Sequence, residues 1–146
     1  MKLNKVLILS FLFSFGLVTT SCVDKGEKED TSHDEQYTKD IVGRWRKASE
    51  ETTEPGKYLY YVYQADGWGY TWDEGDDVSE QEVINEYPGN GWFEWEIYNA
   101  RVVEKHKFTS SSAVTTKRYK ITQLSDTRLV KYDETGEKER IFTRVN

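Results

Sequence analysis

From residue 43 onward, short runs rich in aromatic and β-branched residues are separated by polar stretches. Runs of this kind, separated by turn residues, predict β-strands. We expect about eight strands, at residues 43–49, 58–64, 68–73, 91–99, 101–109, 114–124, 128–133 and 138–145. Tight turns join most of them, and Asp66-Gly67 suits a hairpin because glycine accepts a positive φ. The pattern predicts an all-β domain whose antiparallel strands run up and down and close into a barrel, with a sandwich as the alternative.

The connection between the third and fourth strands, at residues 78–88, has a different pattern. Ser79 and Glu82 have the spacing of a capping box, in which each side chain accepts from the other's backbone N–H. Pro88 disfavours helical geometry at the residue before it and so ends the helix. These signals predict one short helix, whose apolar side includes Val83. The helix is either a plug packed as firmly as the strands or a lid over the barrel mouth, and the plug is the favoured interpretation.

The N-terminal region has the pattern of an export signal. Two lysines precede an apolar run at residues 6–18, which at about 13 residues is shorter than the ~20 of a spanning helix. A basic start, a short apolar run and small residues before the cleavage site are typical of a secretory signal peptide. The segment ending Ser21-Cys22 resembles the lipobox of bacterial lipoproteins, which implies that Cys22 is lipidated and becomes the first mature residue. The alternative is an ordinary cleaved signal in which Cys22 has no role.

Three regions follow from this interpretation: a lipoprotein signal peptide at 1–21, a lipidated cysteine with a flexible acidic tether at 22–39, and the β-domain at 40–146. The tether is predicted to be flexible because it is charged and has almost no apolar residues. Lys28-Glu29-Asp30 resembles a signal that sends Gram-negative lipoproteins to the outer surface. We therefore expect a lipid-anchored protein of the cell envelope, at the outer membrane on its periplasmic or exposed face.

The charge and the cysteine content of the chain argue against several classes of function. The formal net charge is −6, which argues against nucleic acid as a partner because phosphate binding needs clustered cations. The single cysteine excludes an intramolecular disulfide. Seven acids lie within residues 73–86 and eight bases lie within 101–131, so we expect the two regions to pair. The acids at 73–77 miss the spacing of an EF-hand, so neither a metal nor any other cofactor is predicted.

The order of several motifs resembles small lipocalin-like domains of Gram-negative surface lipoproteins. These motifs are Gly43-Arg44-Trp45, then residues 63–69, 93–97 and 119–124, and finally Phe142-Thr143-Arg144. The resemblance implies a barrel in which Trp45 closes one end and Arg144 stacks over it. The mid-barrel motif of true lipocalins is missing. The resemblance therefore supports the barrel more than the carriage of a hydrophobic ligand.

Glu104 and His106 are the chemically distinctive pair of the domain. They alternate on one face of the fifth predicted strand together with Val102 and Phe108. They therefore point into the barrel, either as a buried pair that orients a ligand or in water at the open mouth, which is the favoured placement. Because His106 is the one histidine of the domain and no nucleophile accompanies it, we predict that the protein is not an enzyme.

The aromatic residues are the remaining candidates for binding. Because they are numerous and bulky, we expect a barrel that is largely filled, with a shallow or partly filled pocket near one mouth. The candidate ligand-binding residues are Trp68, Tyr70, Trp72, Trp95, Glu104 and His106.

Three functions are compatible with these candidates. The leading hypothesis is a membrane-anchored lipocalin-like lipoprotein that binds a small hydrophobic molecule or a partner protein. One alternative is a lipoprotein that contacts glycans through exposed Trp and Tyr, with Trp92 as a further candidate. Another is a structural accessory subunit of an envelope complex. Aromatics inside the barrel favour the first hypothesis, and coplanar aromatics outside favour the glycan.

Overall fold

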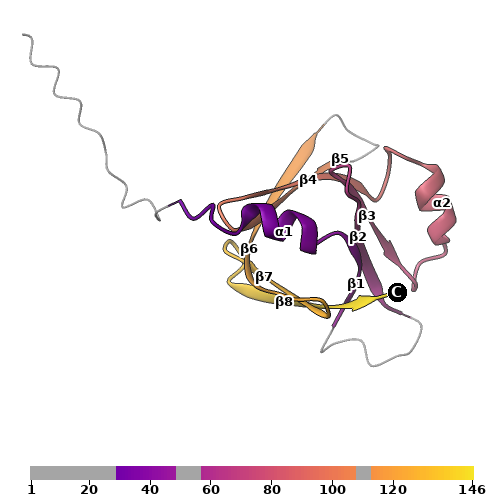
Figure 1. Cartoon of the computed structure of the whole chain (residues 1–146). Helices are drawn as coiled ribbons and strands as arrows, with labels where there is room; N and C mark the ends of the chain where they lie inside the picture. Colours follow the sequence, from indigo (N-terminus) through magenta and orange to yellow (C-terminus); the bar gives the residue numbers. More distant parts are fainter. Residues whose placement is uncertain (1–28, 49–56, 108–112) are drawn as a thin grey trace, which may run out of the picture.

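The computed structural model describes residues 29–48, 57–107 and 113–146, which form a closed barrel (Figure 1). Each strand pairs antiparallel with the next, and β1 pairs with β8 to close the ring. The strands are β1 (Gly43–Lys47), β2 (Leu59–Tyr63), β3 (Trp68–Asp73), β4 (Trp92–Tyr98), β5 (Arg101–Lys107), β6 (Val114–Leu124), β7 (Arg128–Asp133) and β8 (Lys138–Val145). The predicted all-β fold of eight antiparallel strands is confirmed. The predicted signal peptide and Cys22 lie outside the described residues.

The core lies inside the ring because alternate residues of each strand point inward. Ten buried residues from β1, β2 and β4 to β8, together with Ile41, form one apolar cluster. Its most enclosed members, each no more than 1% exposed, are Ile41, Trp45, Tyr63, Phe93, Val102, Leu129 and Phe142. Gly69 makes room for one of them, since a Cβ there would overlap the ring of Phe93.

A helix, α1 (Asp34–Asp40), lies across one end of the barrel (Figure 1). The Asp34 carboxylate accepts hydrogen bonds of 2.8 Å from the backbone N–H groups of Asn99 and Ala100, in the turn between β4 and β5. Tyr37 packs against the core cluster. The predicted tether of residues 22–39 is therefore wrong for its last part. Composition predicted no order there because the stabilising contacts come from residues more than 60 positions away.

Trp45 and Arg144 meet at this same end, as the resemblance implied. The Arg144 guanidinium lies 4.2 Å from the centre of the Trp45 ring, and the indole N–H donates to the Ile41 carbonyl at 2.7 Å. Arg144 also donates to the backbone carbonyls of Asp40 and Val42. Gly43 allows this approach, because a Cβ there would overlap Nη1 of Arg144. The arginine thus joins the last strand to the chain between α1 and β1.

The helix predicted between the third and fourth strands is α2 (Glu80–Asn85). Its N-cap is Ser79, and both hydrogen bonds of the capping box with Glu82 are present. The predicted helix and its capping box are confirmed. They could be predicted from the sequence because a capping box involves only residues three positions apart.

The position predicted for α2 is wrong, because the helix is neither a plug nor a lid. Figure 1 shows α2 outside the ring, beside β3, and Val83 packs against Tyr70 and Trp92 on the outer face of the wall. Strands β2 and β4 carry aromatic residues on both faces, so the sequence does not reveal which face of the wall receives the helix.

Candidate functional site

The predicted binding residues separate into two groups on opposite faces of the barrel wall. Trp95, Glu104 and His106 point inward, and Trp95 belongs to the core cluster. Tyr70 belongs to a second cluster outside the ring, with Trp68 and Trp72 packed against it. Residues that the sequence suggested as one site therefore form two sites.

A buried network of polar side chains occupies the barrel interior. Nζ of Lys131 lies 2.7 Å from Oε1 of Glu104, and the Tyr63 hydroxyl donates to the same oxygen at 2.5 Å. Lys131 also donates to the Tyr63 oxygen at 2.9 Å. On the other carboxylate oxygen, Nε2 of His106 lies at 3.1 Å. These groups come from three strands, β2, β5 and β7, so only the closed ring brings them together.

The favoured placement of Glu104 and His106 at the water-filled mouth is wrong. The side chain of Glu104 is 0% exposed and that of His106 is 13% exposed. Glu104 is buried because Lys131, which is itself 1% exposed, supplies a compensating charge from β7. A carboxylate is otherwise too costly to remove from water.

Four aromatic rings enclose the ammonium of Lys131. Nζ lies within 5.6 Å of every ring centre in this group, which we call the Lys131 cage and which consists of Tyr61, Tyr63, Tyr119 and Phe142. The nearest are Tyr61 and Tyr119, both at 4.5 Å. Each ring face carries partial negative charge and attracts a cation at this range. The cage and Glu104 together replace the water that a free ammonium would hold.

The network shifts the pKa values of its members. Burial alone would raise the pKa of Glu104, but the charge of Lys131 and the hydrogen bonds from His106, Lys131 and Tyr63 outweigh it and lower that pKa to about 2. Burial lowers the pKa of Lys131, and Glu104 opposes this effect. Burial next to Glu104 raises the pKa of Tyr63 well above its ordinary value. At neutral pH the carboxyl of Glu104 is therefore ionised, with Nζ of Lys131 2.7 Å away, and Tyr63 remains a hydrogen-bond donor.

Sequence reasoning missed Lys131. Leu129 and Lys131 share one face of β7, whereas Val130 and Tyr132 share the other, so each face carries an apolar residue. A lysine on the same face as a leucine is a weak sign of a buried charge. Its partner Glu104 lies 27 positions earlier in the chain, and no local pattern joins the two.

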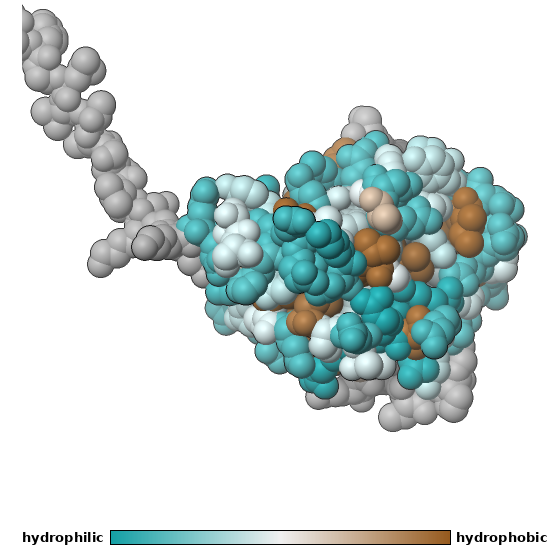
Figure 2. All heavy atoms as spheres, viewed as in Figure 1, coloured by the Kyte–Doolittle hydropathy of each residue, from teal (hydrophilic) through white to brown (hydrophobic). Residues whose placement is uncertain are grey.

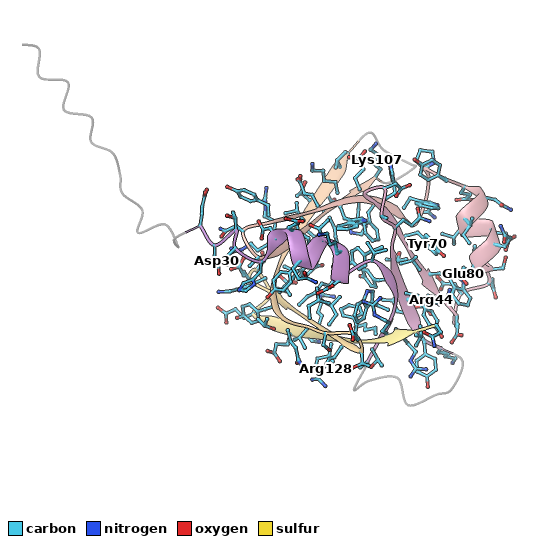
Figure 3. All side chains as sticks on the ribbon, viewed as in Figure 1. Asp30, Arg44, Tyr70, Glu80, Lys107 and Arg128 are labelled. Atoms are coloured by element: carbon cyan, nitrogen blue, oxygen red, sulfur yellow. The ribbon has the colours of Figure 1, made fainter. Side chains whose placement is uncertain are left out.

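The outer group surrounds α2 and is held by a smaller polar network. Figure 3 shows Arg44, Tyr70 and Glu80 together between the wall and the helix. The Glu80 carboxylate accepts from Arg44 at 2.5 Å and from the Tyr70 hydroxyl at 2.9 Å. The indole N–H of Trp92 donates to the Val83 carbonyl at 2.7 Å. These contacts fasten both ends of α2 to the outer wall.

The predicted pairing of the acidic and basic regions does not match the ion pairs that the structure shows. Glu80 of the acidic region pairs with Arg44 of β1. Lys105 and Lys107 of the basic region pair with Glu96 and Glu94 on the neighbouring strand β4. The prediction failed because pairing follows strand order, and β4 lies between the two regions.

A groove of about 340 Å³ runs between α2 and the rim of the wall. Trp72 lines it, and this ring stacks on Tyr60 with centres 5.4 Å apart and planes 16° apart. The indole N–H of Trp72 donates to the Val78 carbonyl at 2.9 Å. The acidic and amide side chains that line the same groove are Asp73, Asp76, Glu86 and Asn90.

The other outer tryptophan, Trp68, is covered differently. Tyr87 meets it edge to face at 5.1 Å, and Nζ of Lys107 lies 5.5 Å from the centre of its ring. On the face seen in Figure 2, hydrophobic residues form small separate patches among hydrophilic ones. Trp72, stacked on Tyr60 at the edge of the groove, is therefore a candidate for contact with a ligand.

Searches against family models, curated proteins and solved structures found no match for this chain. Among the described residues, no cluster of three or more His, Cys, Asp or Glu side chains is arranged to hold a metal ion. None of the helices in the described ranges has the length and apolar character needed to cross a membrane.

Proposed function

We propose that this chain is a membrane-anchored, lipocalin-like lipoprotein of the cell envelope, located at the outer membrane. It is not an enzyme, and it binds a small molecule or a partner protein on its outer surface. The observation that carries the proposal is the ion pair of Glu104 and Lys131 in the middle of the barrel. A hydrophobic ligand in that position would have to separate Glu104 from Lys131, and each charge would then be buried without a partner. Binding is therefore assigned to the wall and rim.

The barrel itself supports the lipocalin-like part of the proposal. Eight antiparallel strands close in sequence order, and the Trp45 ring lies under Arg144 at the end crossed by α1. The envelope location rests on the signal-like residues 1–21 and on Cys22.

The groove beside α2 specifically favours a second candidate function, contact with a glycan. Binding sites for small ligands combine an apolar wall with a few convergent polar groups. Here the Trp72 ring provides the wall, and Asp73, Asp76 and Asn90 provide acceptors and a donor for hydroxyl groups. The acidic lining would repel an anionic sugar, so the ligand of this site would be a neutral saccharide.

Metabolic labelling tests the anchor. Cells grown with a palmitate analogue should label the wild-type chain, and Cys22→Ala should lose both the label and recovery in the membrane fraction. A control, Ser21→Ala, keeps a small residue before the cysteine and should still be labelled. An unlabelled wild-type protein in the soluble fraction would contradict the proposal.

Titration with sugars tests the groove. Neutral oligosaccharides should quench or shift the Trp fluorescence of the wild type, whereas acidic ones should have much less effect. Trp72→Ala should abolish the response, and the matched control Trp68→Ala, on the same strand but outside the groove, should retain it. Equal responses in both variants would remove Trp72 from the site. A hydrophobic dye that enters the folded wild-type barrel would contradict the assignment of binding to the outside.

A further inference from the structure

The surroundings of the Lys131 ammonium have the composition of a binding site for an organic cation. One full negative charge lies on Glu104 at 2.7 Å, and the Tyr63 oxygen accepts at 2.9 Å. The four rings of the Lys131 cage cover other directions around Nζ. Carboxylate, hydroxyl and aromatic faces are the groups by which proteins recognise ammonium ligands.

The walls of the Lys131 cage are held by contacts that do not involve Lys131. Tyr61 meets Phe142 edge to face at 5.2 Å, and Tyr63 meets both Phe93 and Trp95 edge to face at 5.5 Å. The second oxygen of Glu104 is held separately by His106. The strand ladder fixes the backbone behind each ring. Loss of the lysine side chain would therefore leave a shaped cavity, since well-packed surroundings relax only partly around a deletion.

We propose that the centre of this barrel is a binding site for a primary alkylammonium, which the chain fills with its own Lys131. In the native protein the tethered ammonium stays at a very high effective concentration and excludes free amines. Truncation of the lysine would expose the site. Lys131→Ala removes three methylene groups and the ammonium, and n-propylammonium restores those same atoms.

Thermal unfolding of the full chain with added n-propylammonium tests the proposal, at ionic strength held constant with sodium chloride. A ligand that binds only the folded state raises Tm as its concentration increases. We expect Tm of Lys131→Ala to rise with n-propylammonium, and the wild type to show no rise beyond that in sodium chloride. The uncharged 1-propanol should bind at least about tenfold more weakly, since it cannot pair with Glu104.

Two variants make the result specific. In Lys131→Ala/Glu104→Gln the preference for n-propylammonium over 1-propanol should disappear, because the carboxylate is gone. Lys131→Met keeps a chain of similar length in the cage and should not respond to the amine. If Lys131→Ala is unfolded by itself, recovery of its β-sheet circular dichroism with n-propylammonium supports the proposal. No recovery, no rise in Tm, or an equal response to 1-propanol would overturn it.

Discussion

Aromatic residues line both the inner and the outer side of the wall formed by strands β2 to β4, but they do different things on each side. Inside, Tyr61 and Tyr63 surround a buried charge pair. Outside, at the alternate positions, Tyr60 and Trp72 stack at the edge of a groove, and Tyr70 lies under α2. Residue type therefore does not decide the role of an aromatic in this wall.

The difference between the faces comes from the closure of the barrel. Closure makes the strands β5 and β7 face β2 across the interior, so that Glu104, Lys131 and Tyr63 converge away from water. Within the described part of the chain, one short helix, α2, covers this outer face. Its polar groups remain partly solvated, since the side chains of Arg44 and Glu80 are 29% and 23% exposed. A hydrogen bond in the buried inner network therefore contributes more to stability than one in the partly solvated outer network.

The largest effect should follow from removing one member of the inner pair. Glu104→Ala leaves the Lys131 ammonium buried without a counter-ion, and we expect a loss of about 3–5 kcal/mol in the free energy of unfolding, measured with denaturant. The control Glu104→Leu/Lys131→Met replaces both charges with apolar groups and should cost far less. Similar losses in the two proteins would show that packing, and not charge, holds the interior.

Acid should lower the free energy of unfolding through protonation of Glu104. The pKa of Glu104 is about 2 in the folded protein against an ordinary 4.5, so the unfolded chain takes up the proton first as the pH falls. Its contribution of about 3 kcal/mol is complete above pH 4.5 and disappears as the pH falls toward 2. Glu104→Gln should have a flatter pH dependence of unfolding in that window. The same pH dependence of the free energy of unfolding in the wild type and the variant would contradict the lowered pKa of Glu104.

The outer face should fail locally when α2 is detached. Val83→Asp places a charge against Tyr70 and Trp92, and we expect a loss of about 2 kcal/mol, close to the value of burying one valine. Hydrogen exchange should speed up in α2 while the amides of β5 to β7 stay protected. The control Ile84→Asp changes an exposed neighbour and should have little effect. Accelerated exchange throughout the barrel would make α2 part of the core.

The smallest effect should come from the polar contacts that hold α2. Tyr70→Phe removes the hydroxyl that donates to Glu80, and because Arg44 still pairs with that carboxylate we expect a loss of about 1 kcal/mol. The matched inner change, Tyr63→Phe, removes a hydroxyl bonded to both Glu104 and Lys131 and should cost more. Chemical denaturation of the two variants compares the faces directly, and a larger loss in Tyr70→Phe would reverse the comparison.

The sequence by itself determined the features that depend on near neighbours. Aromatic and β-branched runs between turn residues predicted the β-strands to within about two residues, because such side chains pack well on a pleated surface. The spacing of Ser79 and Glu82 predicted the cap of α2. The contact of Trp45 with Arg144 joins residues far apart in the chain, and it was predicted from the resemblance to lipocalin-like domains and not from any local pattern.

Only the tertiary structure decided where these elements meet. The order in α1 depends on the carboxylate of Asp34 reaching the turn at Asn99, and the side on which α2 packs depends on which aromatics point outward. The ion pair between Glu104 and Lys131 forms only when the barrel is closed. In each case the stabilising contact joins residues far apart in the chain, and its energy exists only after the barrel has excluded water.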